Sequence, residues 1–246
     1  EETLAPQGIL ERNDPRVREL EGLERCVGVV RGQVPERLEV HQHGIGFEVD
    51  PWAGQKTGLF LDQRENHQAA GHYARGRALD CFSYTGGFSL AMAIRCDEVM
   101  AVDASRPALE TLARQATQLG VRVVTNEGNV FDLLRALERN GERFDTIVLD
   151  PPAFAKNRRA LSKAVAGYKE INLRALKLLQ PGGVLVTCSC SYHLDEAGFA
   201  QMLYEASLDA HAPVVVVEKR MQARDHPVVL GIPETYYLKC FVVRRM

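Results

Sequence analysis

Apolar and polar residues change their spacing about a third of the way along the chain. From about Arg77 onward, short apolar runs alternate with longer segments that have a helical period. The expected strands are 78–82, 98–102, 121–125, 146–149, 184–188, 214–217 and 236–243, and the expected helices are 88–95, 106–119, 130–140, 163–179 and 196–210. Strands that alternate with helices of ten or more residues indicate an α/β fold, with a parallel sheet and helices on both faces.

The first 55 residues follow a different pattern. Apolar runs at 26–30, 38–40 and 46–49 are short, and turn residues such as Gly32, Pro35 and Gly44 separate them. Asn13-Asp14-Pro15 is a start signal for a short helix that ends near Leu20. Because so few apolar residues cannot build an independent core, the pattern predicts a small β-rich appendage at 1–55 before a larger domain at 56–246.

Composition narrows the class of protein. The chain has 246 residues, 46% of them hydrophobic, with a net charge of -2. No run approaches the roughly 20 apolar residues that a membrane span needs. Neither a secretory leader nor a metal-binding spacing of the six cysteines is seen, so we expect a cytoplasmic protein without metal. The chain begins with Glu1 rather than Met, which we interpret as a fragment with its upstream part missing.

The net charge counts mildly against a nucleic-acid-binding surface over the whole molecule. Two local basic clusters remain, one at Lys156, Arg158, Arg159 and Lys163 and a sparser one at Arg220 and Arg224. A solvated face is the more common explanation of such clusters.

Ligands of parallel sheets bind where the strands end, near a switch in strand order. After the first expected strand the chain reads Asp80-Cys81-Phe82-Ser83-Tyr84-Thr85-Gly86-Gly87-Phe88. Glycines there let the backbone approach a ligand, and the helix that follows offers free N–H groups. The dinucleotide pattern GxGxxG is absent, so a cofactor without pyrophosphate is favoured.

Two later residues complete this expected cofactor site. Asp103 ends the second strand, where a carboxylate accepts hydrogen bonds from ribose hydroxyls. Asn129 follows the third strand, within reach of an adenine edge. Single signals have plainer explanations, since the glycine pair could form an ordinary turn and Asp103 or Ser105 could cap the next helix. Their order and spacing together predict a nucleoside cofactor.

The fourth expected strand runs into Asp150-Pro151-Pro152-Ala153-Phe154. Two prolines fix the backbone and remove two donors, so a rigid loop is expected at the sheet edge. Phe154 could stack on a flipped-out base, and Asp150 could accept from its exocyclic amine. The alternative is a plain turn with Phe154 packed in the core.

Two cysteines end the fifth expected strand, and alternation places Cys188 and Cys190 on the same face. Cys188 lies deeper and is interpreted as a packed, inert thiol. Cys190 lies at the strand end, beside the Asp-Pro-Pro loop, where a nucleophile could act on cytosine C6. Two buried structural cysteines remain an equally good interpretation of these residues alone.

With these residues in view, the chain resembles the bacterial large-subunit ribosomal RNA cytosine-5 methyltransferases. The similarity lies in Tyr84-Thr85-Gly86-Gly87-Phe88, Asp150-Pro151-Pro152-Ala153-Phe154, Ser189-Cys190-Ser191, Tyr237-Leu238-Lys239 and, most specifically, the segment 54–66 (GQKTGLFLDQREN). The resemblance implies an S-adenosylmethionine-dependent enzyme that forms 5-methylcytosine in ribosomal RNA. It implies the Rossmann-like class I methyltransferase sheet with the last strand antiparallel. An N-terminal PUA RNA-binding domain typical of the family is missing here, and a homodimer stays open.

Roles follow from the resemblance residue by residue. Cys190 would be the nucleophile, with Asp150 as the second catalytic residue. The expected cofactor-binding residues are Asp62, Gln63, Arg64, Asp80, Phe82, Tyr84, Thr85, Gly86, Gly87, Asp103, Asn129, Asp150 and Pro151. The expected substrate-binding residues are Pro152, Phe154 and Lys156. No residue is assigned as the base that removes the C5 proton.

Three alternatives stay open. A related branch methylates guanine N7 and needs no covalent adduct, which makes Cys190 unnecessary. Enzymes that methylate amino groups usually place an aromatic residue directly after Pro-Pro, where this chain has Ala153. The third alternative is a non-catalytic ribosome-assembly factor, against which the intact cofactor loop and Cys190 both count, because a protein that has lost its activity needs neither.

Overall fold

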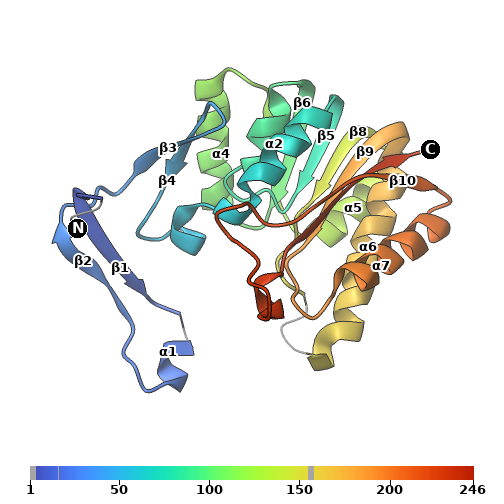
Figure 1. Ribbon diagram of the computed structural model, residues 1–246. Helices are drawn as coiled ribbons and strands as arrows, with labels where there is room; N and C mark the ends of the chain where they lie inside the picture. The colour runs from blue at the N-terminus through green and yellow to red at the C-terminus, as the bar shows by residue number, and fades with distance from the viewer. Residues whose placement is uncertain (1–3, 16, 155–157) are drawn as a thin grey trace. The chain divides into compact units, whose positions relative to one another are not determined.

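The computed structural model describes residues 4–15, 17–154 and 158–246, and Figure 1 shows the chain. The chain divides into two compact units, Glu1–Phe60 and Leu61–Met246. This division lies five residues after the 55/56 boundary expected from the sequence, because the 3₁₀ helix η1 (Gln55–Gly58) lies within the first unit.

The first unit contains two separate antiparallel hairpins. One pairs β1 (Gly8–Asn13) with β2 (Cys26–Gly32), and the short helix α1 (Val17–Leu20) lies between them in sequence. The other pairs β3 (Leu38–Gln42) with β4 (Ile45–Val49). In β4 the apolar side chains of Ile45, Phe47 and Val49 are buried in alternation. The described part of the first unit therefore contains four strands, of which β1 was not predicted.

A seven-stranded sheet forms the centre of the second unit, in the order β10-β11-β9-β8-β5-β6-β7. Its strands are β5 (Gly76–Cys81), β6 (Cys96–Asp103), β7 (Val123–Glu127), β8 (Phe144–Leu149), β9 (Leu179–Ser189), β10 (Val214–Arg220) and β11 (Lys239–Arg245). β5 to β9 pair in parallel, while β11 inserts antiparallel between β9 and β10. The predicted Rossmann-like sheet, with its last strand antiparallel, is confirmed.

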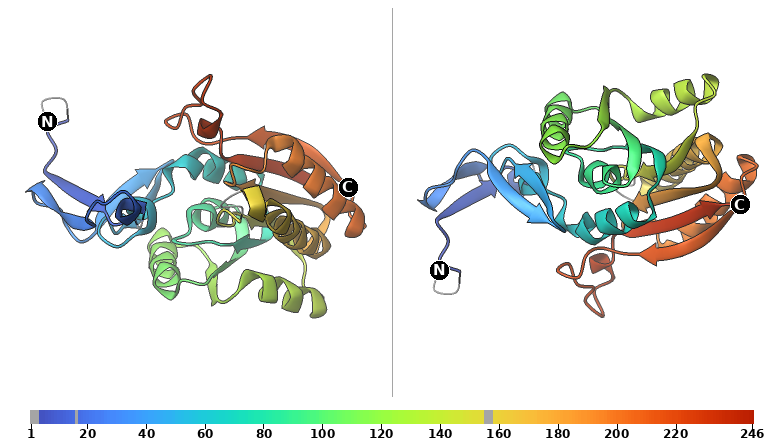
Figure 2. Two further views of the ribbon diagram at one scale, coloured as in Figure 1. Left: turned by 90° about the horizontal axis from the view of Figure 1, so that it is seen from below. Right: turned by 90° about the horizontal axis from the view of Figure 1, so that it is seen from above.

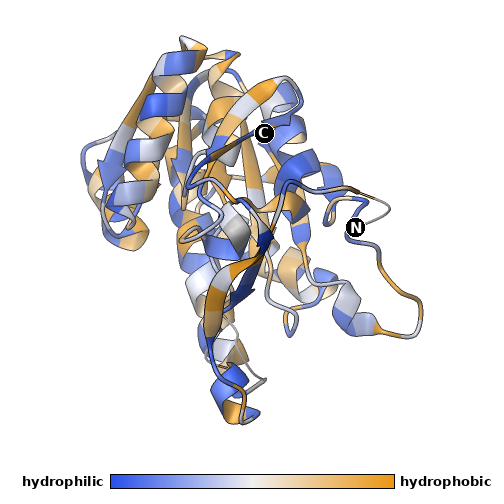
Figure 3. Ribbon diagram, turned by 90° about the vertical axis from the view of Figure 1, so that its left-hand side faces the viewer, coloured by the Kyte–Doolittle hydropathy of each residue, from blue (hydrophilic) through white to orange (hydrophobic). Residues whose placement is uncertain are grey.

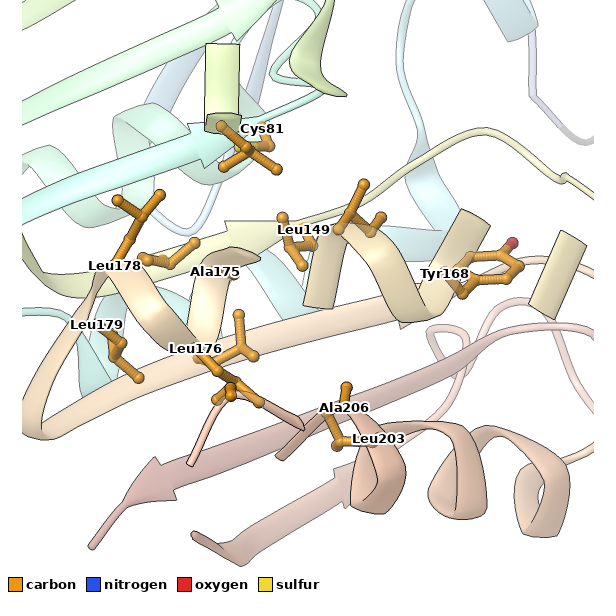
Figure 4. Packing of buried hydrophobic residues seen from close by; sticks show 14 of the residues in the cluster. Cys81, Leu149, Tyr168, Ala175, Leu176, Leu178, Leu179, Leu203 and Ala206 are labelled. Atoms are coloured by element: carbon orange, nitrogen blue, oxygen red, sulfur yellow. The ribbon is translucent and has the colours of Figure 1, made fainter. Parts of the chain in front are cut away.

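Helices lie on both faces of this sheet, as the two views of Figure 2 show. One apolar cluster joins the sheet to α2 (Arg64–Tyr73) and α3 (Gly87–Ala93). The other joins it to α5 (Val130–Arg139), α6 (Leu161–Leu178) and α7 (Glu196–Asp209). Figure 4 shows Cys81 and Leu149 of the sheet beside Tyr168 and Ala175 of α6 in this second cluster. The strands carry much of the apolar colour in Figure 3, which agrees with a sheet buried on both faces.

Helix α4 (Arg106–Leu119) has the bounds that the sequence predicts. Ser105 caps its start by accepting a hydrogen bond from the Ala108 amide, and Gly120 ends it in the left-handed conformation. Among the helices of the described residues, none combines the length and apolar character that crossing a membrane requires.

Candidate active site

The strand order of the sheet reverses between β5 and β8, which lie side by side at its centre. β6 and β7 continue on one side of this pair, and β9 continues on the other. The Asp150 amide donates to the Cys81 carbonyl over 3.4 Å, so the loops that leave the two strands meet. A switch point of this kind is where open α/β sheets bind their ligands, and both motif loops lie there.

The loop after β5 has an unusual backbone. Phe82 and Tyr84 adopt positive φ angles of 67° and 47°, which bulky side chains rarely do. The amides of Phe82 and Ser83 both donate to the Val102 carbonyl, and the Tyr84 amide donates to the Asp103 carboxylate over 2.9 Å. Such conformations cost about 1–3 kcal/mol each and cluster at ligand sites. The loop is therefore shaped by bonds to the neighbouring strand β6.

Protein packing requires the two glycines of this loop. Gly86 has φ 95°, and a Cβ there would lie 2.2 Å from the Leu112 side chain. A Cβ at Gly87 would lie 2.3 Å from the His67 ring. The Thr85 carbonyl accepts from Gln115 over 2.8 Å, which fixes the loop to α4. Close approach of α2 and α4 explains both glycines, while approach of a ligand stays a prediction.

Asp80 offers an acceptor to a ligand. It is fully buried at the end of β5, and its Oδ2 accepts from the Ser89 hydroxyl over 2.6 Å. Its Oδ1 is buried with no hydrogen-bond partner among the described residues. Burial raises the pKa of Asp80 to about 7, while the Ser89 hydrogen bond opposes that rise. A buried acceptor without a donor fits a cofactor that brings its own N–H group, such as the ammonium of S-adenosylmethionine.

The Asp103 and Asn129 side chains are bound to nearby backbone. Asp103 accepts from the Tyr84 and Ser105 amides, at 2.9 and 2.8 Å. The cap of α4 is therefore Ser105 and not Asp103. Asn129 caps α5, and its Oδ1 accepts from the Phe131 amide over 2.9 Å. A carboxylate keeps further lone pairs for ribose hydroxyls, and the Asn129 amine group keeps its donors for an adenine edge.

Three residues at the start of α2 connect distant parts of the second unit. The buried Asp62 accepts from the Tyr237 hydroxyl over 2.9 Å. Gln63, also buried, donates to the Asp150 carboxylate over 2.7 Å. Arg64 pairs with Asp225 at 2.9 Å. Gln63 thus ties the "DQR" segment to the Asp-Pro-Pro loop, while contact of these three residues with the cofactor stays a prediction.

The Asp-Pro-Pro loop holds its residues in different environments. Pro151 is buried and Pro152 is exposed. Phe154 is half-buried and packs against the rings of Phe82, Phe131 and Tyr168, with centroids 6.5, 5.9 and 4.6 Å away. Packing therefore accounts for Phe154, and its stacking on a base stays a prediction. Lys156 lies outside the described residues.

Cys188 and Cys190 differ as the sequence predicts. Cys188 is fully buried opposite Cys240 of β11, and burial holds the pKa of its thiol well above the usual value. Cys190 follows β9 directly and is half-buried. Its Sγ lies 3.9 Å from the Pro151 carbonyl oxygen. A deeply buried thiol is unreactive, whereas Cys190 combines partial exposure with contact to the neighbouring motif loop.

Sequence analysis named Tyr237 and Lys239 only as part of a resemblance segment and assigned neither of them a role at this site. Tyr237, the donor to Asp62, has its pKa raised by burial and by that carboxylate. Lys239 is buried at the start of β11 and donates to the Ser191 carbonyl over 2.7 Å. The sequence signal for Lys239 is its position directly before the apolar run 240–243, because a lysine at the start of a buried strand is unusual.

The basic cluster of Arg220 and Arg224 is largely engaged within the protein. Arg220 donates to Asn66 over 2.9 Å and pairs with Glu218. Arg224 is exposed and lies 3.6 Å from Glu65. The described residues contain no cluster of His, Cys, Asp or Glu that could hold a metal ion.

The site lies at the switch point of a mostly parallel sheet and lacks a dinucleotide loop, which fits a protein that binds a nucleoside cofactor. Residues 23–234 match the family model described as S-adenosylmethionine-dependent methyltransferase, and the chain belongs to that family.

Curated relatives give a more specific similarity. Proteins named Ribosomal RNA large subunit methyltransferase I are 45% identical over 96% of this chain in Erwinia tasmaniensis and 44% identical over 98% in Aeromonas salmonicida. The chain spans 61% and 63% of the length of these two relatives.

Solved structures share the fold. The crystal structure of SMU.776 complexed with S-adenosylhomocysteine (SAH) has a TM-score of 0.78 at 22% identity, over 89% of this chain and 58% of that one. The SAM-dependent methyltransferase from Agrobacterium tumefaciens has a TM-score of 0.71 at 18% identity, over 98% of this chain and 77% of that one.

Proposed function

We propose that the protein methylates carbon 5 of a cytosine in large-subunit ribosomal RNA, with Cys190 as the nucleophile. The observation that carries the proposal is the position of the Cys190 thiol, 3.9 Å from the Pro151 carbonyl oxygen, where β8 and β9 end side by side. The names of the curated relatives support ribosomal RNA as the substrate class.

The proposed chemistry explains why a cysteine is placed there. Carbon 5 of cytosine is a weak nucleophile until a thiolate adds to carbon 6. The Cys190 thiolate forms the bond to C6 and moves the ring electron pair toward C5. S-adenosylmethionine, when bound, would supply an electrophilic methyl group to C5, and its sulfur would keep the electron pair of the broken S–C bond as the cofactor becomes S-adenosylhomocysteine. Loss of the C5 proton then restores the C5–C6 double bond and expels Cys190 as a thiolate.

The cofactor would lie across the ends of β5 to β8. Asp80 would accept from its ammonium, Asp103 would accept from the ribose hydroxyls, and Asn129 would lie at the adenine edge. Gln63 donates to Asp150 over 2.7 Å, which holds that carboxylate in place at the start of the Asp-Pro-Pro loop. Each of these residues lies at or directly after a strand end, or at the start of α2.

Methyl transfer to large-subunit ribosomal RNA, followed by mass analysis of the nucleosides, tests the proposal. We expect 5-methylcytidine with the wild type and none with Cys190→Ala. Cys188→Ala is the matched control, because it removes a thiol from the same strand two residues away and should keep methyl transfer. RNA that carries 5-fluorocytidine should form a covalent complex with the wild type and not with Cys190→Ala, because fluorine blocks the final elimination.

Two results would replace this function. A methylated guanine that persists in Cys190→Ala would favour guanine-N7 methylation. If SAH gives no thermal stabilisation, the protein does not bind this cofactor and the proposed methyl transfer is wrong, because a ligand that binds the native state raises its stability. We also place the protein in the cytoplasm, where ribosomes are assembled. A homodimer is a separate proposal that sedimentation equilibrium tests.

A further inference from the structure

Lys239 is a buried lysine next to the candidate nucleophile. Only 1% of its surface is exposed. Its ammonium donates to the Ser191 carbonyl over 2.7 Å and to the Tyr237 carbonyl over 2.9 Å. The strand register pairs Lys239 with Ser189. Lys239 therefore contacts the residues on both sides of Cys190. Its backbone pairs with Ser189, and its ammonium donates to the Ser191 carbonyl.

The charge of Lys239 is not neutralised by a carboxylate. Among the described residues, none of the ion pairs involves this ammonium, and both of its acceptors are neutral carbonyls. A buried charge without a counterion is unfavourable. Burial lowers the pKa of Lys239 to about 8, and a negative charge on Cys190 or Asp195 opposes that fall. The lysine thus remains mostly protonated at neutral pH, and it interacts electrostatically with the Cys190 side chain.

Tyr168, Tyr237 and Asp195, which lie near this pair, do not supply the missing anion. Burial raises the pKa of Tyr168, and burial together with Asp62 raises that of Tyr237, so both phenols stay neutral. Asp195 is exposed and already accepts from the Gly198 amide at the start of α7, so solvent screens its charge. A negative charge at Cys190 would balance the buried ammonium.

We propose that Lys239 is a positioning residue whose ammonium stabilises the Cys190 thiolate and holds the Ser191 carbonyl, so that the sulfur is ready to add to the base. The inference rests on the proposed role of Cys190 as nucleophile. On ionisation the proton leaves Sγ for water, the electron pair stays on sulfur, and Lys239 keeps its own proton. The same ammonium stabilises the thiolate that is expelled when the adduct breaks down.

The pH dependence of alkylation by iodoacetamide tests this role, because the thiolate is the species that reacts. The rate is followed at the Cys190 peptide by mass spectrometry in the wild type, Lys239→Met and Lys239→Gln. We expect the midpoint at Cys190 to rise by about one pH unit or more in both variants, with about tenfold slower reaction below the midpoint. The exposed Cys26 is the internal reference and should keep its profile.

Two controls separate charge from structure. Lys219→Met removes an exposed lysine of the neighbouring strand β10, which pairs with Glu196, and should leave the Cys190 midpoint unchanged. Lys239→Gln keeps a donor for the Ser191 carbonyl without the charge, so it decides the question if Lys239→Met unfolds. Thermal denaturation with and without SAH shows whether each variant is folded. An unchanged midpoint in a folded Lys239→Gln protein would overturn the proposal.

The outcome is distinguishable from failure of the proposed function. If Cys190→Ala abolishes 5-methylcytidine while the lysine variants alkylate like the wild type, Cys190 is the nucleophile and Lys239 does not assist it. If the midpoint rises in the lysine variants while Cys190→Ala still methylates, Lys239 does stabilise the thiolate and the catalytic use of Cys190 is wrong.

Discussion

Asp80 lies fully buried at the end of β5, with a pKa that burial raises from 3.8 to about 7. Between these values the folded protein holds a proton that the unfolded chain has released, so folding stability should fall as pH rises from about 4 to 7. The loss is on the order of 4 kcal/mol, at about 1.4 kcal/mol per pKa unit. Asp80→Asn should lack this slope, which urea denaturation at a series of pH values measures.

Cofactor binding gives a second measurement at the same residue. If the cofactor ammonium approaches Asp80, the stabilisation by SAH should grow between pH 6 and 8 as the carboxylate ionises, and it should stay flat in Asp80→Asn. Asp97→Asn removes an exposed carboxylate of β6 and serves as the control. A wild-type response to SAH that is independent of pH would contradict the assignment of Asp80 to the cofactor.

Helices α2 and α3 pack closely at Gly71. A Cβ there would lie 2.6 Å from the Ala91 carbonyl oxygen, a backbone atom that cannot rotate away. We expect Gly71→Ala to lose about 1–3 kcal/mol of stability through overpacking, more than the gain of about 1 kcal/mol in helix propensity. Chemical denaturation followed by circular dichroism measures this. Gly128→Ala is the control, since its Cβ meets nothing closer than 3.9 Å, and equal losses in both variants would refute the argument.

The predictability of these elements depends on how local their signals are. The bounds of α4 were predicted because a serine cap, an apolar stripe and a terminal glycine all lie within one segment. Helix α2 was missed, since its residues are mostly polar or small and only Asn66, Ala70 and Gly71 are buried. Its helical state depends on packing against α3, which no local pattern encodes.

Residues at strand ends were assigned to the candidate site from the sequence, whereas residues that reach the site by pairing between distant segments were given no role. Cys190 and Asp150 follow two strands that are successive in the chain and paired in the sheet, so the positions of the strand ends in the sequence were enough to expect the two residues close together. Lys239 reaches Ser191 because β11 returns antiparallel beside β9, a contact across 48 positions. Hydrogen bonds of this kind, like that from Tyr237 to Asp62, depend on register, which the sequence pattern leaves open.

The two units should differ in local stability. In the hairpin of β1 and β2 none of the residues is buried, and a two-stranded hairpin is marginally stable by itself. Strands β5 and β8 lie inside a seven-stranded sheet and are mostly buried. We expect backbone amides of β1 and β2 to exchange with deuterium at least a hundredfold faster than those of β5 and β8, because about 2.7 kcal/mol separates such rates. Hydrogen exchange with mass spectrometry on the whole chain measures this, and equal protection in both units would mean that the hairpin gains stability from contacts beyond its own two strands.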